Sequence, residues 1–170
     1  NASRLSESAA RVRVLASRMR EVVWAVNPRC DTVSSLASFL EQQASQFFHQ
    51  ANLRVLFEFP EDIPATPLDA NSRHQLALSV REALTNVVRH AQATEAVIAL
   101  TLDSKRLIVE ITDNGCGFDP AKVAGAGQGL LNLGERLRGI GGRFEYASQI
   151  GVGTTVRFVL PLRGALGLHG

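Results

Sequence analysis

Residues 82–91 read EALTNVVRHA and residues 113–118 read DNGCGF, and the prediction of the fold begins from these two stretches. On a helix, Glu82 and Asn86 leave the same face one turn apart, with apolar residues on the other face. This carboxylate and amide suit a metal ion and a triphosphate. Asp113 ends an apolar stretch and precedes two glycines, which let the backbone turn sharply and approach a ligand such as a base edge. Together the two stretches predict a nucleotide pocket.

The composition is that of a globular domain of ordinary size. The chain has 170 residues, 45% hydrophobic and 20% charged, and no apolar run approaches the roughly 20 residues of a membrane span. The net charge of +2 gives no reason to expect a nucleic-acid partner. Cys30 and Cys116 lack metal-ligand spacing and favour a reducing compartment. We expect a cytoplasmic location for this region, and a membrane anchor in the full-length protein stays open.

An apolar seam runs through the first part of the chain, whose polar start at 1–8 suggests a piece of a longer protein. From Leu5 onward, apolar residues recur at steps alternating three and four, as in a heptad pattern that ends before Pro28. The members of this seam are Val12, Leu15, Met19, Val22 and Val26. Two explanations stay open: an amphipathic helix packed on its own domain, or a helix that dimerises.

The rest of the chain predicts an α+β domain with a mixed sheet, because hairpins exclude a purely parallel one. Between the two hairpins, residues 114–129 hold five glycines and a proline, which predicts an irregular lid. The expected elements are a helix from Asp31 or Thr32 to about Asn52, a strand at 54–59, a helix capped by Asp69 or Asn71, a hairpin of 96–102 with 106–112, a helix from Leu130 to Ile140, and a hairpin of 143–147 with 154–160. We divide the chain into a helical module at 1–30, a catalytic domain at 31–163 and a tail at 164–170.

The order of these motifs resembles the catalytic domain of sensor histidine kinases, which belongs to the GHKL superfamily together with gyrase and mismatch-repair ATPases. The resemblance covers about residues 31–162 and implies a two-layer α/β sandwich of the Bergerat type, with helices on one face of a mixed sheet. The matching motifs are the helix of residues 81–91, the Asp113-x-Gly115-x-Gly117 box, Gly127-x-Gly129-Leu130, and Gly153-Thr154 before the last strand. The residues of these motifs are most similar to those of the subgroup whose partners are response regulators of the nitrate-sensing type. Residues 24–28, WAVNP, are similar to the end of that subgroup's dimerisation helix.

The resemblance implies a role for each site residue. Glu82 would be catalytic, as a base or by orienting a metal-bound water, and Asn86 would offer its amide oxygen to Mg²⁺. Asp113 would accept the adenine amino group. The other expected nucleotide-binding residues are Arg89, His90, Gly115, Gly117, Gly127, Gly129, Leu130 and Thr154. Each also has a structural explanation, such as a turn-capping Asp, a solvated Arg or an ordinary strand Thr.

The resemblance implies an enzyme that transfers the γ-phosphoryl group of ATP to a histidine, with Mg²⁺ as cofactor and a response regulator as partner. It also implies a homodimer formed through the helical module. The phosphoacceptor pattern of the subgroup surrounds none of the four histidines, His49, His74, His90 and His169, so we expect transfer in trans and no autophosphorylation. The alternatives are a GHKL-type serine kinase or ATPase and a nucleotide-binding module without catalysis.

Overall fold

The computed structural model describes residues 8, 9, 11, 12, 15, 16, 19, 22–24, 26–123 and 128–162. The elements in chain order are η1 (Pro28–Cys30), α2 (Val33–Gln50), β1 (Arg54–Glu58), α3 (Ala70–Asn86), η2 (Val87–Ala91), β2 (Glu95–Leu102), β3 (Arg106–Asp113), α4 (Pro120–Val123), α5 (Gln128–Gly139), β4 (Arg143–Gln149) and β5 (Gly153–Pro161). Within these described residues, no helix is long and apolar enough to span a membrane. Leu5, the tail at 164–170 and His169 lie outside them.

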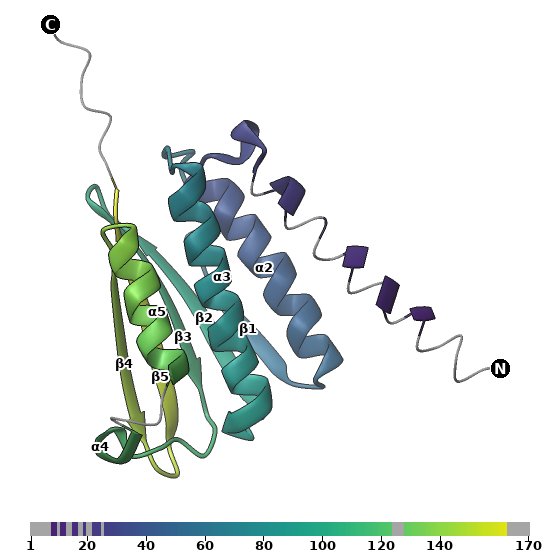
Figure 1. Cartoon of the computed structure of the whole chain (residues 1–170), viewed down its shortest axis with the longest axis vertical. Coiled ribbons are helices and arrows are strands. Elements are labelled where there is room, and N and C mark those ends of the chain that lie inside the picture. Colours follow the sequence, from purple (N-terminus) through teal and green to yellow (C-terminus); the bar gives the residue numbers. More distant parts are fainter. Residues whose placement is uncertain are drawn as a thin grey trace, which may run out of the picture.

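The five strands form one mixed sheet in the order β1-β2-β3-β5-β4. β1 and β2 are parallel and are joined through α3, whereas the pairs β2–β3, β3–β5 and β4–β5 are antiparallel. The two predicted hairpins and the mixed sheet are therefore confirmed. Figure 1 shows α2, α3 and α5 side by side over one face of this sheet, the two-layer arrangement that the resemblance implied.

Side-chain caps fix where the two long helices begin. Thr32 accepts a hydrogen bond from the backbone N–H of Ser35 at 3.2 Å, and Asp69 accepts one from the N–H of Ser72 at 2.9 Å. Such caps satisfy amide groups that have no partner inside the helix. The sequence offered two candidate caps for each helix, and the structure selects Thr32 and Asp69.

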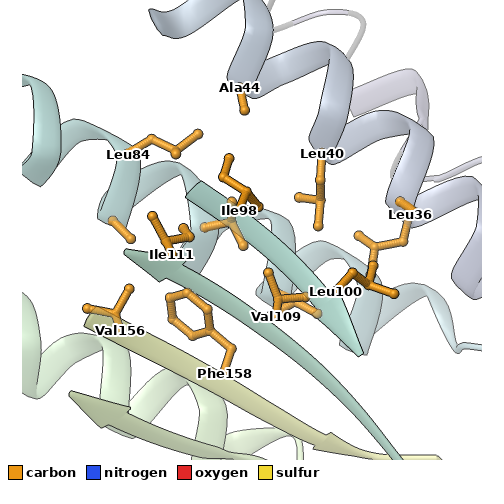
Figure 2. Close-up of a cluster of buried hydrophobic side chains, with 14 of the residues drawn as sticks. Leu36, Leu40, Ala44, Leu84, Ile98, Leu100, Val109, Ile111, Val156 and Phe158 are labelled. Carbon is orange, nitrogen blue, oxygen red and sulfur yellow. The ribbon is translucent and has the colours of Figure 1, made fainter. Parts of the chain in front are cut away.

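The core lies between the sheet and the helices, and it holds α3 in a fixed orientation. β3 alternates buried and less buried residues along its length, as a strand with one covered face does. Figure 2 shows buried side chains of α2, α3 and the central strands meeting in one cluster. The predicted stripe of α3, which includes Leu76, Val80, Ala83 and Leu84, is buried against this cluster. Glu82 and Asn86 therefore leave α3 away from the core.

A buried arginine fastens the segment before α2 to α3. Arg73, on the first turn of α3, is fully buried and pairs with Asp31 at 2.7 Å. Its guanidinium also donates to the Trp24 carbonyl and lies 4.3 Å from the centre of the Trp24 ring. The same ring stacks on Phe39 of α2 at 3.8 Å. The Trp24 side chain is thus packed on the domain.

The seam residues are not buried against the domain. Val12, Leu15, Met19, Val22 and Val26 are each at least 59% exposed. The structure therefore does not show the first of the two explanations that the sequence left open, in which this seam packs on its own domain.

The expectation that 114–129 contains no regular element was wrong at two places. α4 forms a short helix within it, and α5 already begins at Gln128. Pro120 suits the first helical position because its fixed φ matches the helix and no N–H is needed there. Asp119 caps the same turn by accepting a hydrogen bond from Ala121 N at 3.0 Å. The Asp-Pro pair is typical of a helix start, and the prediction from the glycine count did not take it into account.

Candidate nucleotide site

A cavity of about 510 Å³ lies where α3 and η2, the ends of β3 and β5, and the start of α5 meet. Its volume falls in the range of small-molecule sites. The lining residues are Ala83, Asn86, Val87, His90, Ala91, Ile111, Asp113, Cys116, Gly117, Phe118, Gly129, Leu130, Thr154 and Val156. The wall is mostly apolar, with a few polar groups from separate elements, which suits a flat apolar ligand with polar edges.

Asp113 is the buried acid of this cavity. It ends β3, is 6% exposed and lies opposite Thr154 of β5 in the sheet register. Burial raises the pKa of its carboxyl, while hydrogen bonds from the backbone N–H groups of Gly115 and Thr154 lower it and oppose that effect. The bond from Gly115 N is 2.8 Å long. Because an ionised carboxylate has about four acceptor positions, two remain for a ligand.

The helix side of the cavity carries Asn86 and, one turn earlier, Glu82. Asn86 lines the cavity at the end of α3. Glu82 is exposed at its rim and faces the start of α5, since a Cβ added at Gly129 would lie 3.7 Å from Glu82 Oε1. The described residues contain no cluster of three or more metal-ligating side chains. A hard cation held here would take most of its oxygen ligands from phosphates and water, as Mg²⁺ commonly does.

The turn after α3 decides which of its basic residues reaches the cavity. η2 is a π-helix, whose i→i+5 hydrogen bonds widen the turn and change the angular step between residues. His90 lines the cavity, whereas Arg89 is exposed and lies outside the lining. The sequence analysis had treated residues 81–91 as one helix and had placed both Arg89 and His90 at the site. The five-residue turn brings only His90 to the cavity wall.

The loop after Asp113 is clamped on both sides by backbone contacts. On the η2 side, Cys116 N donates to Ala91 O at 2.6 Å, and a Cβ at Gly115 would lie only 2.3 Å from the same oxygen. On the β4–β5 side, Gly117 has φ +60° and a Cβ there would lie 2.0 Å from Gln149 O. No other residue type fits either position without displacing backbone. Gly117 lines the cavity, while Gly115 lies behind it.

Most of the predicted site residues are brought together. Those on the cavity wall are Asn86, His90, Asp113, Gly117, Gly129, Leu130 and Thr154. Glu82 and Gly115 adjoin the wall, Arg89 does not reach it, and Gly127 lies outside the described residues. The functional roles of all these residues stay predictions.

The sequence analysis assigned no individual role to Phe118 or to Ser148. Phe118 lines the cavity, and Ser148 of β4 joins it from behind by accepting a hydrogen bond from Phe118 N at 2.8 Å. Residues 148–153 had been assigned to the connection between strands, but β4 runs to Gln149 and pairs Ser148 with Thr154. A tight turn centred on Gly151 would have predicted that pair.

Both the sequence and the fold are similar to those of known proteins. Residues 71–164 match the family "Histidine kinase-, DNA gyrase B-, and HSP90-like ATPase". An uncharacterised sensor-like histidine kinase of Chloroflexus aurantiacus is 30% identical over 150 residues, which cover 85% of this chain and 25% of that protein. The chain therefore spans about a quarter of the length of this curated relative.

Two solved structures share the fold. The histidine kinase domain of a blue-light activated histidine kinase from Erythrobacter litoralis EL346 superposes with a TM-score of 0.60 at 23% identity, over 78% of this chain and 64% of that one. The histidine kinase AdeS of Acinetobacter baumannii gives a TM-score of 0.62 at 14% identity, over 94% and 84% of the two chains. At these identities the likeness extends to the fold alone, and it agrees with the mixed sheet and its helical layer.

Proposed function

Because the chain belongs to the family of histidine kinase-, DNA gyrase B- and HSP90-like ATPases, we propose that it is the ATP-binding catalytic domain of a sensor histidine kinase. The observation that carries the proposal is the cavity itself. One buried acid, Asp113, lies at its sheet end, and the half-buried amide of Asn86, with the exposed Glu82 at the rim, lies at its helix end. An adenine nucleotide likewise has an amino group at its base end and phosphates at its other end.

At the base end, Asp113 accepts the exocyclic amino group of adenine. The carboxylate is already held by the hydrogen bond from Gly115 N, so binding costs little reorganisation. Guanine carries a carbonyl oxygen at the corresponding position, which would face the carboxylate as a second acceptor. Apolar wall residues such as Ile111 and Val156 contact the faces of the ring.

At the phosphate end, Asn86 offers its amide oxygen to Mg²⁺, which neutralises the phosphate charge. Gly129 and Leu130 lie in the first turn of α5, where backbone N–H groups lack partners within the helix and can meet phosphate oxygens. Glu82 orients water or the attacking imidazole, and His90 contacts the phosphates from η2. Arg89 reaches them only after its side chain turns from the outer face of η2.

Positioning and charge neutralisation account for most of phosphoryl transfer, and a neutral imidazole is already nucleophilic. This chemistry requires no strong base from the protein and is compatible with the exposed position of Glu82. A nitrate-type subgroup, a response regulator as partner and a homodimer are the finer parts of the proposal. The exposed seam from Val12 to Val26 supports the dimer, because apolar side chains at heptad spacing suit a second helix.

Nucleotide binding is the first test of this proposal. Titration calorimetry with ADP and with a non-hydrolysable ATP analogue, each with and without Mg²⁺, should give saturable binding that Mg²⁺ strengthens for the triphosphate analogue. No heat at millimolar nucleotide would overturn the proposal.

Product analysis separates the kinase from the alternatives. The chain is mixed with Mg-ATP and a separately supplied dimerisation helix that carries the acceptor histidine. Acid-labile phosphate on that helix is the expected result, because phosphohistidine hydrolyses in acid. Acid-stable phosphate would instead identify a serine kinase, free phosphate alone a hydrolase, and binding without turnover a non-catalytic module.

A further inference from the structure

Three polar side chains lie in line across the sheet at the cavity. Asp113 of β3 pairs with Thr154 of β5, and Thr154 pairs in turn with Ser148 of β4. The first two line the cavity, whereas Ser148 lies behind Thr154 and is not part of the wall. A Ser148 effect on the ligand would therefore pass through its neighbours.

Ser148 Oγ has three polar neighbours. It lies 2.8 Å from Phe118 N, 3.1 Å from Gly153 O and 2.9 Å from Thr154 Oγ1. The N–H of Phe118 can only donate, and the carbonyl of Gly153 can only accept. A serine hydroxyl has one proton and two acceptor lone pairs.

All three contacts can be hydrogen bonds at once only if the third bond has one direction. Ser148 uses one lone pair for Phe118 N–H and its single proton for Gly153 O, so only one lone pair is left. The bond to Thr154 is then satisfied only if the Thr154 hydroxyl donates its proton to Ser148. Thr154 Oγ1 thereby spends its proton inside the protein and has only lone pairs for a ligand.

We propose that Ser148 is a positioning residue for base selection: it holds the Thr154 hydroxyl as an acceptor beside the Asp113 carboxylate. This inference rests on the proposed binding of adenine nucleotide in the cavity. An amino group has two N–H donors, and two adjacent acceptors suit it. A carbonyl oxygen meets two acceptors and no donor, so the arrangement selects adenine over guanine.

Removal of Ser148 Oγ would free the Thr154 hydroxyl to rotate and donate. A rotating hydroxyl serves either base, as hydroxyls commonly do. Ser148→Ala should thus weaken discrimination more than affinity. A merely structural role would lower the affinity for ADP and GDP alike and leave their ratio unchanged.

The test measures Kd for ADP and for GDP by calorimetry on the whole chain. The wild type should bind ADP more tightly than GDP. Ser148→Ala should reduce the ratio of the Kd for GDP to the Kd for ADP by about tenfold, which corresponds to the free energy of about one hydrogen bond. Ser148→Thr keeps the hydroxyl and should restore the ratio. Ser38→Ala removes an exposed α2 hydroxyl that donates to the Ser34 carbonyl, and it should leave both Kd values unchanged.

A double-mutant cycle tests the route through Thr154. Thr154→Val removes the hydroxyl but keeps the side-chain shape, and Ser148→Ala should change the ratio no further in that background. An unchanged ratio in Ser148→Ala, or equal effects with and without the Thr154 hydroxyl, would overturn the inference while leaving ADP binding intact. Absence of ADP binding by the wild type would instead count against the proposed function.

Discussion

Replacement of Asp113 by Asn is the sharpest test of the base end of the site. The carboxylate accepts backbone N–H bonds from Gly115 and Thr154 and keeps acceptor positions for a ligand. An amide has one oxygen instead of two, and its NH₂ group would face either a backbone N–H or the adenine amino group, donor against donor. The change is nearly isosteric, so it alters polarity without opening a cavity.

The size of the effect follows from the bonds lost. A hydrogen bond to a charged group contributes about 1.5–3 kcal/mol, and a buried donor left without a partner costs about 1–3 kcal/mol. Loss of the ligand bond alone raises the Kd for ADP by roughly 10- to 150-fold. The buried donor adds to this if the NH₂ group turns toward the cavity. We therefore expect at least about tenfold weaker binding.

The same variant should stay folded. Burial raises the pKa of Asp113, so in the ligand-free domain the ionised form is disfavoured, and the group's contribution to stability is lost as pH rises through that raised pKa. Asn removes this cost at neutral pH while it loses one backbone acceptor. The two effects oppose each other, and we expect a change in Tm within about 4 °C, equivalent to about 1 kcal/mol.

The assay is calorimetry with ADP beside a thermal melt, with Asp103→Asn as control. Asp103 also accepts two backbone N–H bonds, from Lys105 and Arg106 at 2.7 Å each, but it lies in the β2–β3 turn at the other end of the strand. Its pKa is lowered, first by the Lys105 backbone bond, so its contribution to stability is lost as pH falls. The control should bind ADP as the wild type does.

Affinity should also depend on pH. If the ionised carboxylate of Asp113 holds the base, the Kd for ADP rises as pH falls through a pKa above the ordinary 3.8. Equal ADP binding by Asp113→Asn and wild type, with both folded, would refute the assignment of Asp113 to the base. So would equal losses in Asp113→Asn and Asp103→Asn.

Three further predictions concern the rest of the site and its support. Asn86→Ala should raise the Kd of a triphosphate analogue about tenfold in Mg²⁺ and leave the Mg²⁺-free Kd unchanged in calorimetry; equal effects would remove Asn86 from the metal. Gly117→Ala should lower the free energy of unfolding in urea by at least about 2 kcal/mol, because Gly117 has a positive φ and a Cβ there would meet the carbonyl of Gln149. Gly134→Ala is the control: Gly134 lies on α5 with open space around it, so this change should raise the free energy of unfolding by about 0.5–1 kcal/mol. Asp31→Asn should cost about 1–3 kcal/mol in the same assay, since it weakens the charge-assisted bond that the buried Arg73 guanidinium donates to Asp31; a neutral result would show that the other interactions of Arg73 suffice.

The elements that a local sequence pattern determines by itself were predictable from the sequence. Period-2 alternation placed the hairpins, and the apolar stripe of α3 fixed its buried face and so the direction of Asn86. The π-turn at η2 was not predictable, because VVRHA has no helix breaker and its widening follows from tertiary contacts such as that between Cys116 N and Ala91 O. The Arg73 cluster was missed because a lone arginine usually faces solvent, and only the fold brings it under Trp24.

The two glycines of the DNGCGF loop lie at the site as the motif predicts, but the physical reason for glycine at these positions differs from the one that we expected. We expected Gly115 and Gly117 to let the backbone approach a ligand. In the structure, Gly115 is required by the carbonyl of Ala91, and Gly117 by the carbonyl of Gln149, so the close approaches are within the protein. The loop thereby ties the end of the helix that carries Asn86 to the hairpin that carries Thr154. A change at either glycine should thus disturb both ends of the cavity together, which distinguishes it from a change at Asp113, where only the base end responds.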